Sequence, residues 1–306
     1  MIRIHVNDPL SERAMELLKS KKSILNVSSE HLPKEKLIEV IPEVDVLVVR
    51  SATKVTADVI EAGRKLKIIA RAGVGLDNID VKKAQEKGIK VLNTPGASAI
   101  SVAELTFGLI LSCVRHIARG TMDLKEGKWT KKELKGNEIF GKTLGIIGFG
   151  NIGKEVAKRA LCFGMKVLAY DPYVNRTDLQ VEIVDLDTLL RESDIVTLHV
   201  PLTERTKHII NEESISKMKD GVVVINVSRG GIVDEEALYN GLVNGKIKAA
   251  GFDVFEVEPP FDDLRKKLLS LPNVVATPHV GASTVEGQER VGIEIVKRIF
   301  EDLGVQ

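Results

Sequence analysis

A glycine-rich turn stands between two apolar segments near the middle of the chain. The run Leu144–Ile147 is short and apolar, which is typical of a strand buried on both faces of a parallel sheet. Gly148, Gly150 and Gly153 follow it at the spacing GxGxxG, and a helical pattern comes next. Such glycines allow a tight turn and a close approach of a pyrophosphate, whose charge is favoured at a helix N-terminus. The turn is therefore a candidate dinucleotide-binding site.

An acidic residue stands where a dinucleotide-binding motif requires one. Met165 to Tyr170 is predicted to form the next strand, and Asp171 follows it, about 20 residues past the glycines. A carboxylate here can accept hydrogen bonds from both ribose hydroxyls of an adenosine, and it would repel a 2′-phosphate. Glycines and acid together predict that the cofactor is NAD. A strand–helix turn that binds no ligand is the alternative that the glycines alone leave open.

Four more polar residues follow predicted strands in the second half of the chain: Arg229, Asp253, Glu258 and His279. We expect them near the dinucleotide, because the strands of a doubly wound sheet present their carboxyl ends at one edge. Hydride transfer between an alcohol and NAD also requires a proton transfer, for which histidine is the usual acid or base. Glu258 is the candidate to orient His279, and Arg229 is the candidate to grip a carboxylate and polarise a carbonyl. Spacing alone does not select His279 among six histidines, so purely structural roles stay open here.

Two arginines in the first third of the chain also follow predicted strands. Arg50 precedes Ser51, and Arg71 precedes the turn Gly73-Val74-Gly75. The planar guanidinium of arginine suits phosphate, and backbone N–H groups of the glycine turn could cradle a carboxylate. The alternative is that both arginines only cap strand ends or pair with surface acids.

Strand-like and helical patterns alternate along almost the whole chain, which predicts parallel sheets covered on both faces. The fold class that we expect is α/β, with two doubly wound parallel-sheet domains, a Rossmann-type NAD domain being inserted into a flavodoxin-like substrate domain. A long apolar segment, Ala99–Arg119, is predicted as one helix between domains or subunits. The apolar stripe of Val285–Leu303 predicts a helix that returns to the first domain. The expected domains are therefore 1–94 with 284–306, and 95–283.

Composition excludes several other classes of protein. The chain has 306 residues, of which 43% are hydrophobic and 28% charged, with 44 Lys and Arg against 43 Asp and Glu. A net charge of +1 gives no field for nucleic acid or an anionic membrane, and we expect neither as a partner. The start MIRIHVND reads as a strand instead of a signal peptide, and no apolar run has the length of a membrane span, so we expect a cytoplasmic protein. Cys113 and Cys162 are expected to be buried free thiols, and no metal spacing is present.

Across its whole length the chain resembles the NAD-dependent D-isomer-specific 2-hydroxyacid dehydrogenases. Four stretches carry the resemblance: GKTLGIIGFGNIGKEVA from Gly141, LHVPLTERTKHII from Leu198, INVSRGGIVDEEAL from Ile225 and TPHVGAST from Thr277. The resemblance implies that Arg229, Glu258 and His279 are catalytic. It also implies a small-molecule substrate and a homodimer formed through the long helix and the loop after it, which contains Trp129.

The resemblance also supplies binding residues. The implied NAD contacts are Gly148, Gly150, Asn151, Ile152, Gly153, Asp171, His199, Pro201, Thr206, Val227, Ser228, Asp253 and Gly281. The implied substrate contacts are Arg50, Ser51, Arg71, Gly73, Val74, Arg229 and His279.

Within that family the chain most resembles the D-3-phosphoglycerate dehydrogenases. The stretches VRSATKVTADVI from Val49, RAGVGLDNID from Arg71 and DVFEVEPP from Asp253 carry this narrower likeness. It implies oxidation of D-3-phosphoglycerate to 3-phosphohydroxypyruvate, the first step of serine biosynthesis, by a short form without the serine-binding regulatory domain of longer members. A glyoxylate or hydroxypyruvate reductase is the nearest alternative. A corepressor that senses NADH is the alternative from another class.

Overall fold

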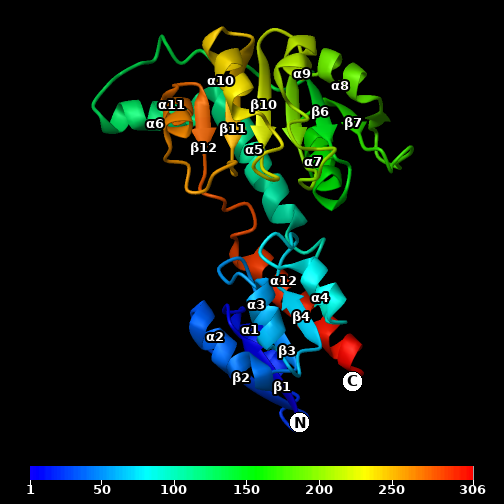
Figure 1. The fold of residues 1–306 in the computed structure, drawn as a ribbon. Coiled ribbons are helices and arrows are strands. Elements are labelled where there is room, and N and C mark those ends of the chain that lie inside the picture. Colours follow the sequence, from blue (N-terminus) through cyan, green and yellow to red (C-terminus); the bar gives the residue numbers. More distant parts are fainter. Residues whose placement is uncertain (306) are drawn as a thin grey trace. The chain divides into compact units, whose positions relative to one another are not determined.

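The structure, a computed structural model, describes residues 1–305 and divides the chain into two compact units. Unit 1 is formed by residues 1–98 together with the chain from residue 282 onward, and unit 2 is formed by residues 99–281 (Figure 1). Unit 2 is thus inserted into unit 1.

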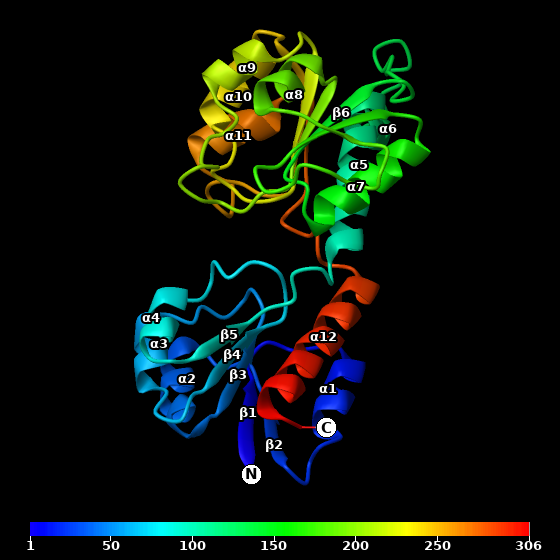
Figure 2. The same ribbon diagram turned by 90° about the vertical axis from the view of Figure 1, so that its right-hand side faces the viewer.

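Unit 1 contains a five-stranded parallel sheet with the strand order β2-β1-β3-β4-β5. This is the flavodoxin-like order, whose topological switch point lies between the first and third strands. Figure 2 shows α1 and α12 on one face of the sheet and α2, α3 and α4 on the other. The strands are β1 (Ile2–Val6), β2 (Leu25–Ser29), β3 (Val46–Val49), β4 (Ile68–Arg71) and β5 (Lys90–Leu92). The helices are α1 (Glu12–Lys19), α2 (Lys34–Val40), the 3₁₀ turn η1 (Ile41–Glu43), α3 (Ala57–Ala62), α4 (Val81–Glu86) and α12 (Val285–Leu303).

The amphipathic helix α12 completes the core of unit 1. Its apolar stripe includes Ile295 and Ile299, which are fully buried in one cluster with Ile4 and Leu18. A helix of this pattern folds stably only when its apolar face is covered, so α1 and the sheet determine where it packs.

Unit 2 contains a seven-stranded parallel sheet with the order β12-β11-β10-β9-β6-β7-β8. Counted from β6, this is the order of a dinucleotide-binding Rossmann fold, whose switch point lies between β6 and β9. The strands are β6 (Thr143–Ile147), β7 (Lys166–Tyr170), β8 (Glu182–Ile183), β9 (Ile195–Leu198), β10 (Val222–Asn226), β11 (Ile247–Phe252) and β12 (Val274–Ala276).

Two helical layers cover this second sheet. Figure 2 shows α5 and α7 on one face and α8, α9, α10 and α11 on the other. Each layer has its own apolar cluster, one around Phe149 and the other around Phe252. The helices are α5 (Ala99–Arg115), α6 (Ile117–Lys125), α7 (Asn151–Cys162), α8 (Leu186–Glu192), α9 (Glu212–Lys217), α10 (Glu235–Val243) and α11 (Asp263–Ser270). The expected pair of doubly wound parallel-sheet domains is confirmed.

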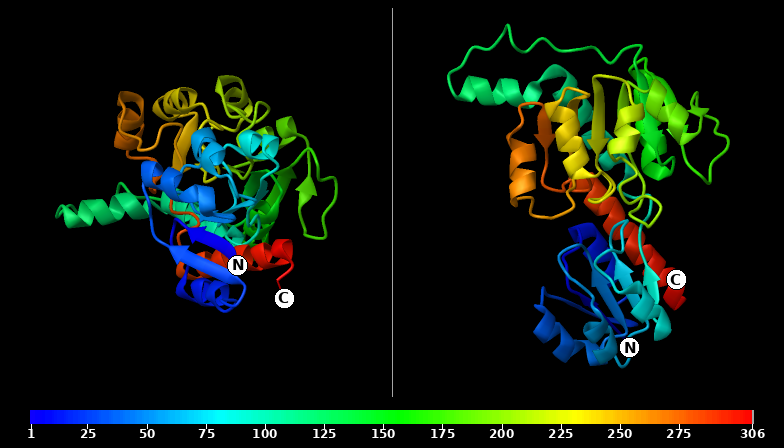
Figure 3. Two further views of the ribbon diagram at one scale, coloured as in Figure 1. Left: turned by 60° about the horizontal axis from the view of Figure 1, so that its bottom comes forward. Right: turned by 45° about the horizontal axis from the view of Figure 1, so that its top comes forward.

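The single helix predicted over Ala99–Arg119 is wrong. His116 adopts a left-handed conformation, with φ 56°, and separates α5 from α6. The chain bends there by 66°, because a residue in this region of φ/ψ space interrupts the helical hydrogen-bond ladder. Figure 3 shows α6 and the loop after it extending away from the sheet of unit 2. Within the described residues, no single helix is long and apolar enough to cross a membrane, and only the bent pair passes such a test together.

The two cysteines differ in environment. Cys113 is buried, and burial raises the pKa of its thiol to about 12. Cys162 is exposed at the last turn of α7, so the expectation of two buried thiols is wrong for this residue. The helical pattern around Cys162 predicted its helix but could not predict which face of that helix meets the core.

Candidate active site

The glycine turn after β6 leaves space in front of a helix N-terminus. Gly148 has φ +95°, and a Cβ there would lie 2.5 Å from the carbonyl oxygen of His199. A Cβ on Gly153 would lie 2.2 Å from the carbonyl oxygen of Gly148, so the helix packs directly against the turn. A Cβ on Gly150 would meet no described atom within 4 Å. Because no described side chain caps α7 there, the turn fits a pyrophosphate.

Asp171 is joined to the glycine turn by a hydrogen bond. Its Oδ2 accepts one from the backbone N–H of Phe149 at 2.9 Å, and its Oδ1 accepts one from that of Tyr173 at 2.9 Å. The carboxylate is thereby fixed at the carboxyl end of β7, and each oxygen retains a further lone pair. Both oxygens are thus available to an adenosine ribose, and the contact of Asp171 with that ribose stays a prediction.

His199 directly follows β9 and lies at the switch point between β6 and β9. Its backbone N–H donates to Ile147, and its ring Nε2 lies 3.0 Å from Oγ1 of Thr197. Nδ1 is shielded from solvent and has no hydrogen-bond partner among the described residues. Burial lowers the pKa of His199 to about 3, so the ring is neutral near pH 7. In the turn that follows, the hydroxyl of Thr206 donates to the carbonyl oxygen of Pro201 at 2.6 Å.

A side chain at the end of β10 shapes the turn that carries Arg229. Oδ1 of Asn226 accepts hydrogen bonds from the backbone N–H of Ser228 at 3.2 Å and from its hydroxyl at 3.0 Å. Nδ2 of Asn226 donates to the carbonyl oxygen of Arg229 at 2.9 Å. Val227 and Ser228 are buried, whereas Arg229 is half-buried. Sequence reasoning missed Asn226, although a polar residue at the end of an otherwise apolar strand was a signal.

The buried carboxylate of Asp253 holds the loop that contains His279. Its Oδ1 accepts from the hydroxyl of Thr277 at 2.6 Å and from the N–H of Val280 at 2.8 Å, and its Oδ2 accepts from the N–H of Gly281 at 2.7 Å. Asp253 is 1% exposed. Its described contacts are thus with the loop after β12, on both sides of His279.

His279 and Glu258 are brought together from loops 21 residues apart. Nδ1 of His279 lies 2.9 Å from Oε2 of Glu258, and Oε1 of Glu258 accepts the backbone N–H of Phe255 at 3.1 Å. His279 has a left-handed backbone, with φ 54°. A carboxylate only accepts hydrogen bonds, so the ring hydrogen in this pair is on Nδ1. Nε2 is then the nitrogen that can exchange a proton with a bound molecule.

The loop of Arg50 in unit 1 is held by residues that the sequence did not single out. Oδ2 of Asp8 accepts the backbone N–H groups of Arg50 at 2.7 Å and of Thr53 at 3.1 Å, and Oδ1 accepts the Thr53 hydroxyl at 2.7 Å. Nδ2 of Asn78 donates to the carbonyl oxygens of Arg50 and Thr53, each at 2.7 Å. Ser51 is exposed in this loop. Asp8 follows β1 and Arg50 follows β3, so the loop lies at the switch point of this sheet.

The guanidinium of Arg71 lies against its own turn. A Cβ on Gly73 would be 1.6 Å from Nη1 of Arg71, and the backbone of Gly73 has φ +151°. The turn continues at Val74, whose carbonyl oxygen accepts a hydrogen bond from Nδ2 of Asn93 at 2.7 Å. Of the two arginines, Arg71 is therefore packed along the backbone of its turn. Within residues 1–305 the guanidinium of Arg50 donates from Nη1 only to the Pro9 carbonyl, at 3.5 Å.

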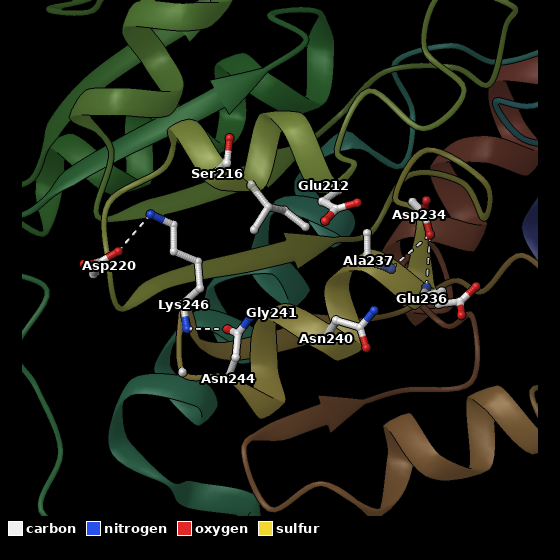
Figure 4. Close-up of a pocket in the computed structure, with 12 residues that line it drawn as sticks. Glu212, Ser216, Asp220, Asp234, Glu236, Ala237, Asn240, Gly241, Asn244 and Lys246 are labelled. Carbon is white, nitrogen blue, oxygen red and sulfur yellow. Dashed lines mark hydrogen bonds and ion pairs between the residues drawn. The ribbon is translucent and has the colours of Figure 1, made fainter.

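A surface groove of about 870 Å³ lies between α9 and α10, and Figure 4 shows its polar lining. Glu212, Asp234 and Glu236 contribute carboxylates to it, and Lys246 is paired with Asp220 at 2.8 Å. None of the site residues expected from the sequence lines this groove. The described residues include no cluster of three or more His, Cys, Asp or Glu side chains suited to a metal ion.

Comparison with known proteins identifies the class. Residues 107–281 match the family described as "D-isomer specific 2-hydroxyacid dehydrogenase, NAD binding domain". The chain is 71% identical over 303 residues to a hydroxypyruvate reductase of Thermotoga maritima, with 99% of each chain covered. It is 52% identical to a D-3-phosphoglycerate dehydrogenase of Methanocaldococcus jannaschii, covering 98% of this chain and 57% of that protein. A crystal structure of the Aquifex aeolicus D-lactate dehydrogenase complexed with NAD and lactic acid has TM-score 0.86 at 35% identity, with 99% and 96% covered.

The fold, the glycine turn and the family match together define an NAD-binding oxidoreductase. The chain belongs to the D-isomer specific 2-hydroxyacid dehydrogenase family. The resemblance recognised in the sequence and the assignment of NAD as cofactor are both confirmed.

The lowered pKa of His199 predicts a specific loss of stability in acid. Its folded pKa of about 3 lies below the ordinary value of about 6.5, so below pH 6.5 the unfolded chain binds a proton that the folded protein does not. Stability is therefore complete above that pH and falls as the pH decreases toward 3. From pH 6.5 to 5 this residue should remove about 2 kcal/mol from the free energy of unfolding. Urea unfolding of the protein without NAD should show this extra loss relative to a His199→Gln variant, and parallel pH curves would contradict it.

Proposed function

We propose that this enzyme interconverts a D-2-hydroxyacid and its 2-oxoacid, with His279 as the general acid or base. The contact between Nδ1 of His279 and Glu258 is the observation that carries this proposal. It leaves Nε2 as the nitrogen for proton exchange and keeps the ring in one orientation. In the proposal unit 2 binds NAD and provides His279, Glu258 and Arg229.

Each catalytic group has a separate task. A bound NAD, which the glycine turn and Asp171 would hold, would supply the acceptor for the hydride of C2. Nε2 of His279 takes the proton of the C2 hydroxyl, and Glu258 stabilises the resulting imidazolium through Nδ1. Arg229 pairs with the substrate carboxylate and draws electron density from the C2 oxygen. In the direction of reduction, the same histidine returns the proton.

Two related substrate pairs fit this chemistry. We favour hydroxypyruvate and D-glycerate, because the Thermotoga relative of equal length is named for hydroxypyruvate. The packing of Arg71 along its own turn supports the choice, since a phosphorylated substrate would need more than one cation besides Arg229. D-3-phosphoglycerate is the second candidate, which would place the enzyme at the start of serine biosynthesis. The position of Arg50 at the switch point of unit 1 and the M. jannaschii relative favour it.

Removal of the proton acceptor should abolish most turnover but not cofactor binding. The variant His279→Asn is expected to lower kcat by roughly 10²–10⁴-fold, because general acid–base catalysis typically contributes that factor. NADH affinity, measured by fluorescence titration, should stay within about twofold, because the glycine turn is untouched. Full activity of this variant with the best substrate would refute the assignment of His279.

Asp171 should determine the preference for NAD over NADP. Its carboxylate is fixed by the Phe149 N–H at the expected ribose position and would oppose a 2′-phosphate. Asp171→Ala should therefore lower the ratio of kcat/KM with NADH to kcat/KM with NADPH. Both values are measured by the fall of absorbance at saturating oxoacid. Tyr173→Ala, an exposed neighbour whose side chain carries no charge, is the control and should leave the ratio unchanged. A wild-type enzyme that uses NADPH better would show that the role of Asp171 is misassigned.

A small substrate panel separates the two candidate pairs. We expect a higher kcat/KM with hydroxypyruvate than with 3-phosphohydroxypyruvate in the wild type. Arg50→Ala should lower kcat/KM for the phosphorylated compound by on the order of ten- to a hundredfold, the effect of losing a charge-assisted contact of about 1.5–3 kcal/mol. The unphosphorylated compound should change little. A strong preference for 3-phosphohydroxypyruvate in the wild type would establish the second candidate, and equal losses on both substrates would remove Arg50 from phosphate recognition.

We further propose a homodimer formed through α6 and the loop after it. Apolar side chains are exposed there without cover from this chain: Ile117, Met122, Leu124, Trp129 and Phe140. Light scattering at micromolar concentration should give twice the chain mass, and Trp129→Asp should shift the equilibrium to monomer, since Trp129 is 80% exposed. Tyr173→Asp, at a residue 83% exposed outside this region, is the control. A monomeric wild type would contradict the proposal.

A further inference from the structure

A buried ion pair joins the first turns of α10 and α11. Oε2 of Glu235 accepts a hydrogen bond from Nε of Arg265 at 2.5 Å. Glu235 is 3% and Arg265 is 9% exposed. Glu235 is the first residue of α10, directly after the cap residue Asp234 (Figure 4), and Arg265 lies in the first turn of α11, where Nη1 also faces Asp262 at 3.4 Å. Both charges are therefore fixed to helix termini on the same side of the sheet.

Both members of this pair also hold Glu256. Oε1 of Glu235 accepts the backbone N–H of Glu256 at 2.8 Å, and Nη2 of Arg265 donates to Oε2 of Glu256 at 3.1 Å. The second carboxylate oxygen of Glu235 is thus occupied by a backbone group, which a neutral apolar residue could not satisfy. An apolar pair of the same volume would leave the N–H of Glu256 unpaired.

The two consecutive peptide groups on either side of the Phe255 Cα connect this ion pair to the proposed catalytic groups. The N–H of Phe255 donates to Oε1 of Glu258, whose other oxygen contacts His279. On the opposite side, a Cβ added at Gly230 would lie 1.9 Å from the carbonyl oxygen of Phe255. Gly230 follows Arg229, so the peptide between Phe255 and Glu256 packs on the arginine turn. The preceding peptide, through the N–H of Phe255, fixes the acid that orients the histidine.

Because Glu235 and Arg265 are charged, the connection from this pair to Glu258 is sensitive to substitution of either residue. Burial raises the pKa of the Glu235 carboxyl, and the charge of Arg265 opposes that rise. Removal of Arg265 would leave the carboxylate of Glu235 with the N–H of Glu256 as its one hydrogen-bond donor among the described residues. The carboxylate and the backbone of Glu256 would then shift, or water would enter beside them. A displacement of the Glu256 N–H would also move the adjoining N–H of Phe255, which holds Glu258.

We propose that Glu235 and Arg265 are positioning residues for the reaction. They set the segment from Phe255 to Glu258 so that Glu258 meets Nδ1 of His279. This inference rests on the proposed function of Glu258 and His279, and neither Glu235 nor Arg265 touches substrate or cofactor in it.

The first test observes the histidine directly and needs no substrate. In ¹H–¹⁵N spectra of the histidine rings, the signals of His279 are identified by their absence in His279→Asn. Arg265→Leu should move these signals toward those recorded in Glu258→Gln, because the contact with Glu258 is lost. Arg265→Lys, which keeps the charge, should lie between wild type and Arg265→Leu. Leu238→Ala removes a buried apolar side chain of α10 and leaves Glu235 and Arg265 in place, so its His279 signals should match the wild type.

The second test separates positioning from stability. Arg265→Leu should lower kcat on the order of ten- to a hundredfold with the best hydroxyacid or oxoacid, the effect of misplacing a catalytic group by about 1 Å. KM for NADH should stay within about twofold. Leu238→Ala, which also destabilises the fold, should leave kcat of the folded enzyme unchanged.

Wild-type ring signals and wild-type kcat in Arg265→Leu would overturn the proposal, as would an equal loss of kcat in Leu238→Ala. If Arg265→Leu does not fold, Glu235→Gln gives the same decision, because the amide keeps the shape but places a donor against Arg265. An enzyme that turns over no hydroxyacid would refute the proposed function, whereas the ring spectra would still decide whether the ion pair positions His279.

Discussion

Parallel pairing is the constraint on which both units depend. Every pair of neighbouring strands in the two sheets runs parallel, so every strand needs a crossover, and helices must cover both faces. The carboxyl ends of the strands then lie along one edge of each sheet. Polar groups that follow strands far apart in sequence are gathered there, and this is why Arg229, Glu258 and His279 occur in loops of one unit.

Buried carboxylates hold these loops in fixed conformations. Asp253 binds three donors of the loop around His279, and Asp8 binds three donors of the loop around Arg50. In both cases a charge removed from water is satisfied by groups of the loop that it holds, and such bonds are stronger than those between neutral groups. His279 can be kept in a left-handed conformation because its neighbours on both sides are tied to Asp253.

The sequence predicted the parts of the structure that depend on local pattern. The glycines and Asp171 have spacings set by one β–α–β unit, so the turn and its acid could be located without knowledge of the rest. The supporting side chains Asp8, Asn78, Glu235 and Arg265 could not be found in this way, because their partners are distant in sequence and their residue types are common at surfaces. Glu235 and Arg265 in particular stand in helical patterns where a charge normally faces solvent.

Two local features also escaped the pattern. The bend at His116 depends on one residue in a left-handed conformation, which apolar periodicity does not report. The exposure of Cys162 depends on where the last turn of α7 meets its neighbours. The sequence pattern also does not distinguish a phosphorylated from an unphosphorylated substrate, because that choice depends on how one side chain packs. The type of residue at Arg71 favours phosphate, whereas the packing of its guanidinium on Gly73 uses part of that capacity.

Because unit 2 is inserted into unit 1, the order of translation affects the order in which the two units can fold. The strands of unit 1 are translated before unit 2, but Ile295 and Ile299 of α12, which fill their core, are translated only after the whole of unit 2. The inserted unit is contiguous and has both of its helical layers before α12 leaves the exit tunnel. Unit 2 should therefore fold first on the ribosome. Until α12 is translated, the sheet of unit 1 stays partly uncovered and accessible to chaperones.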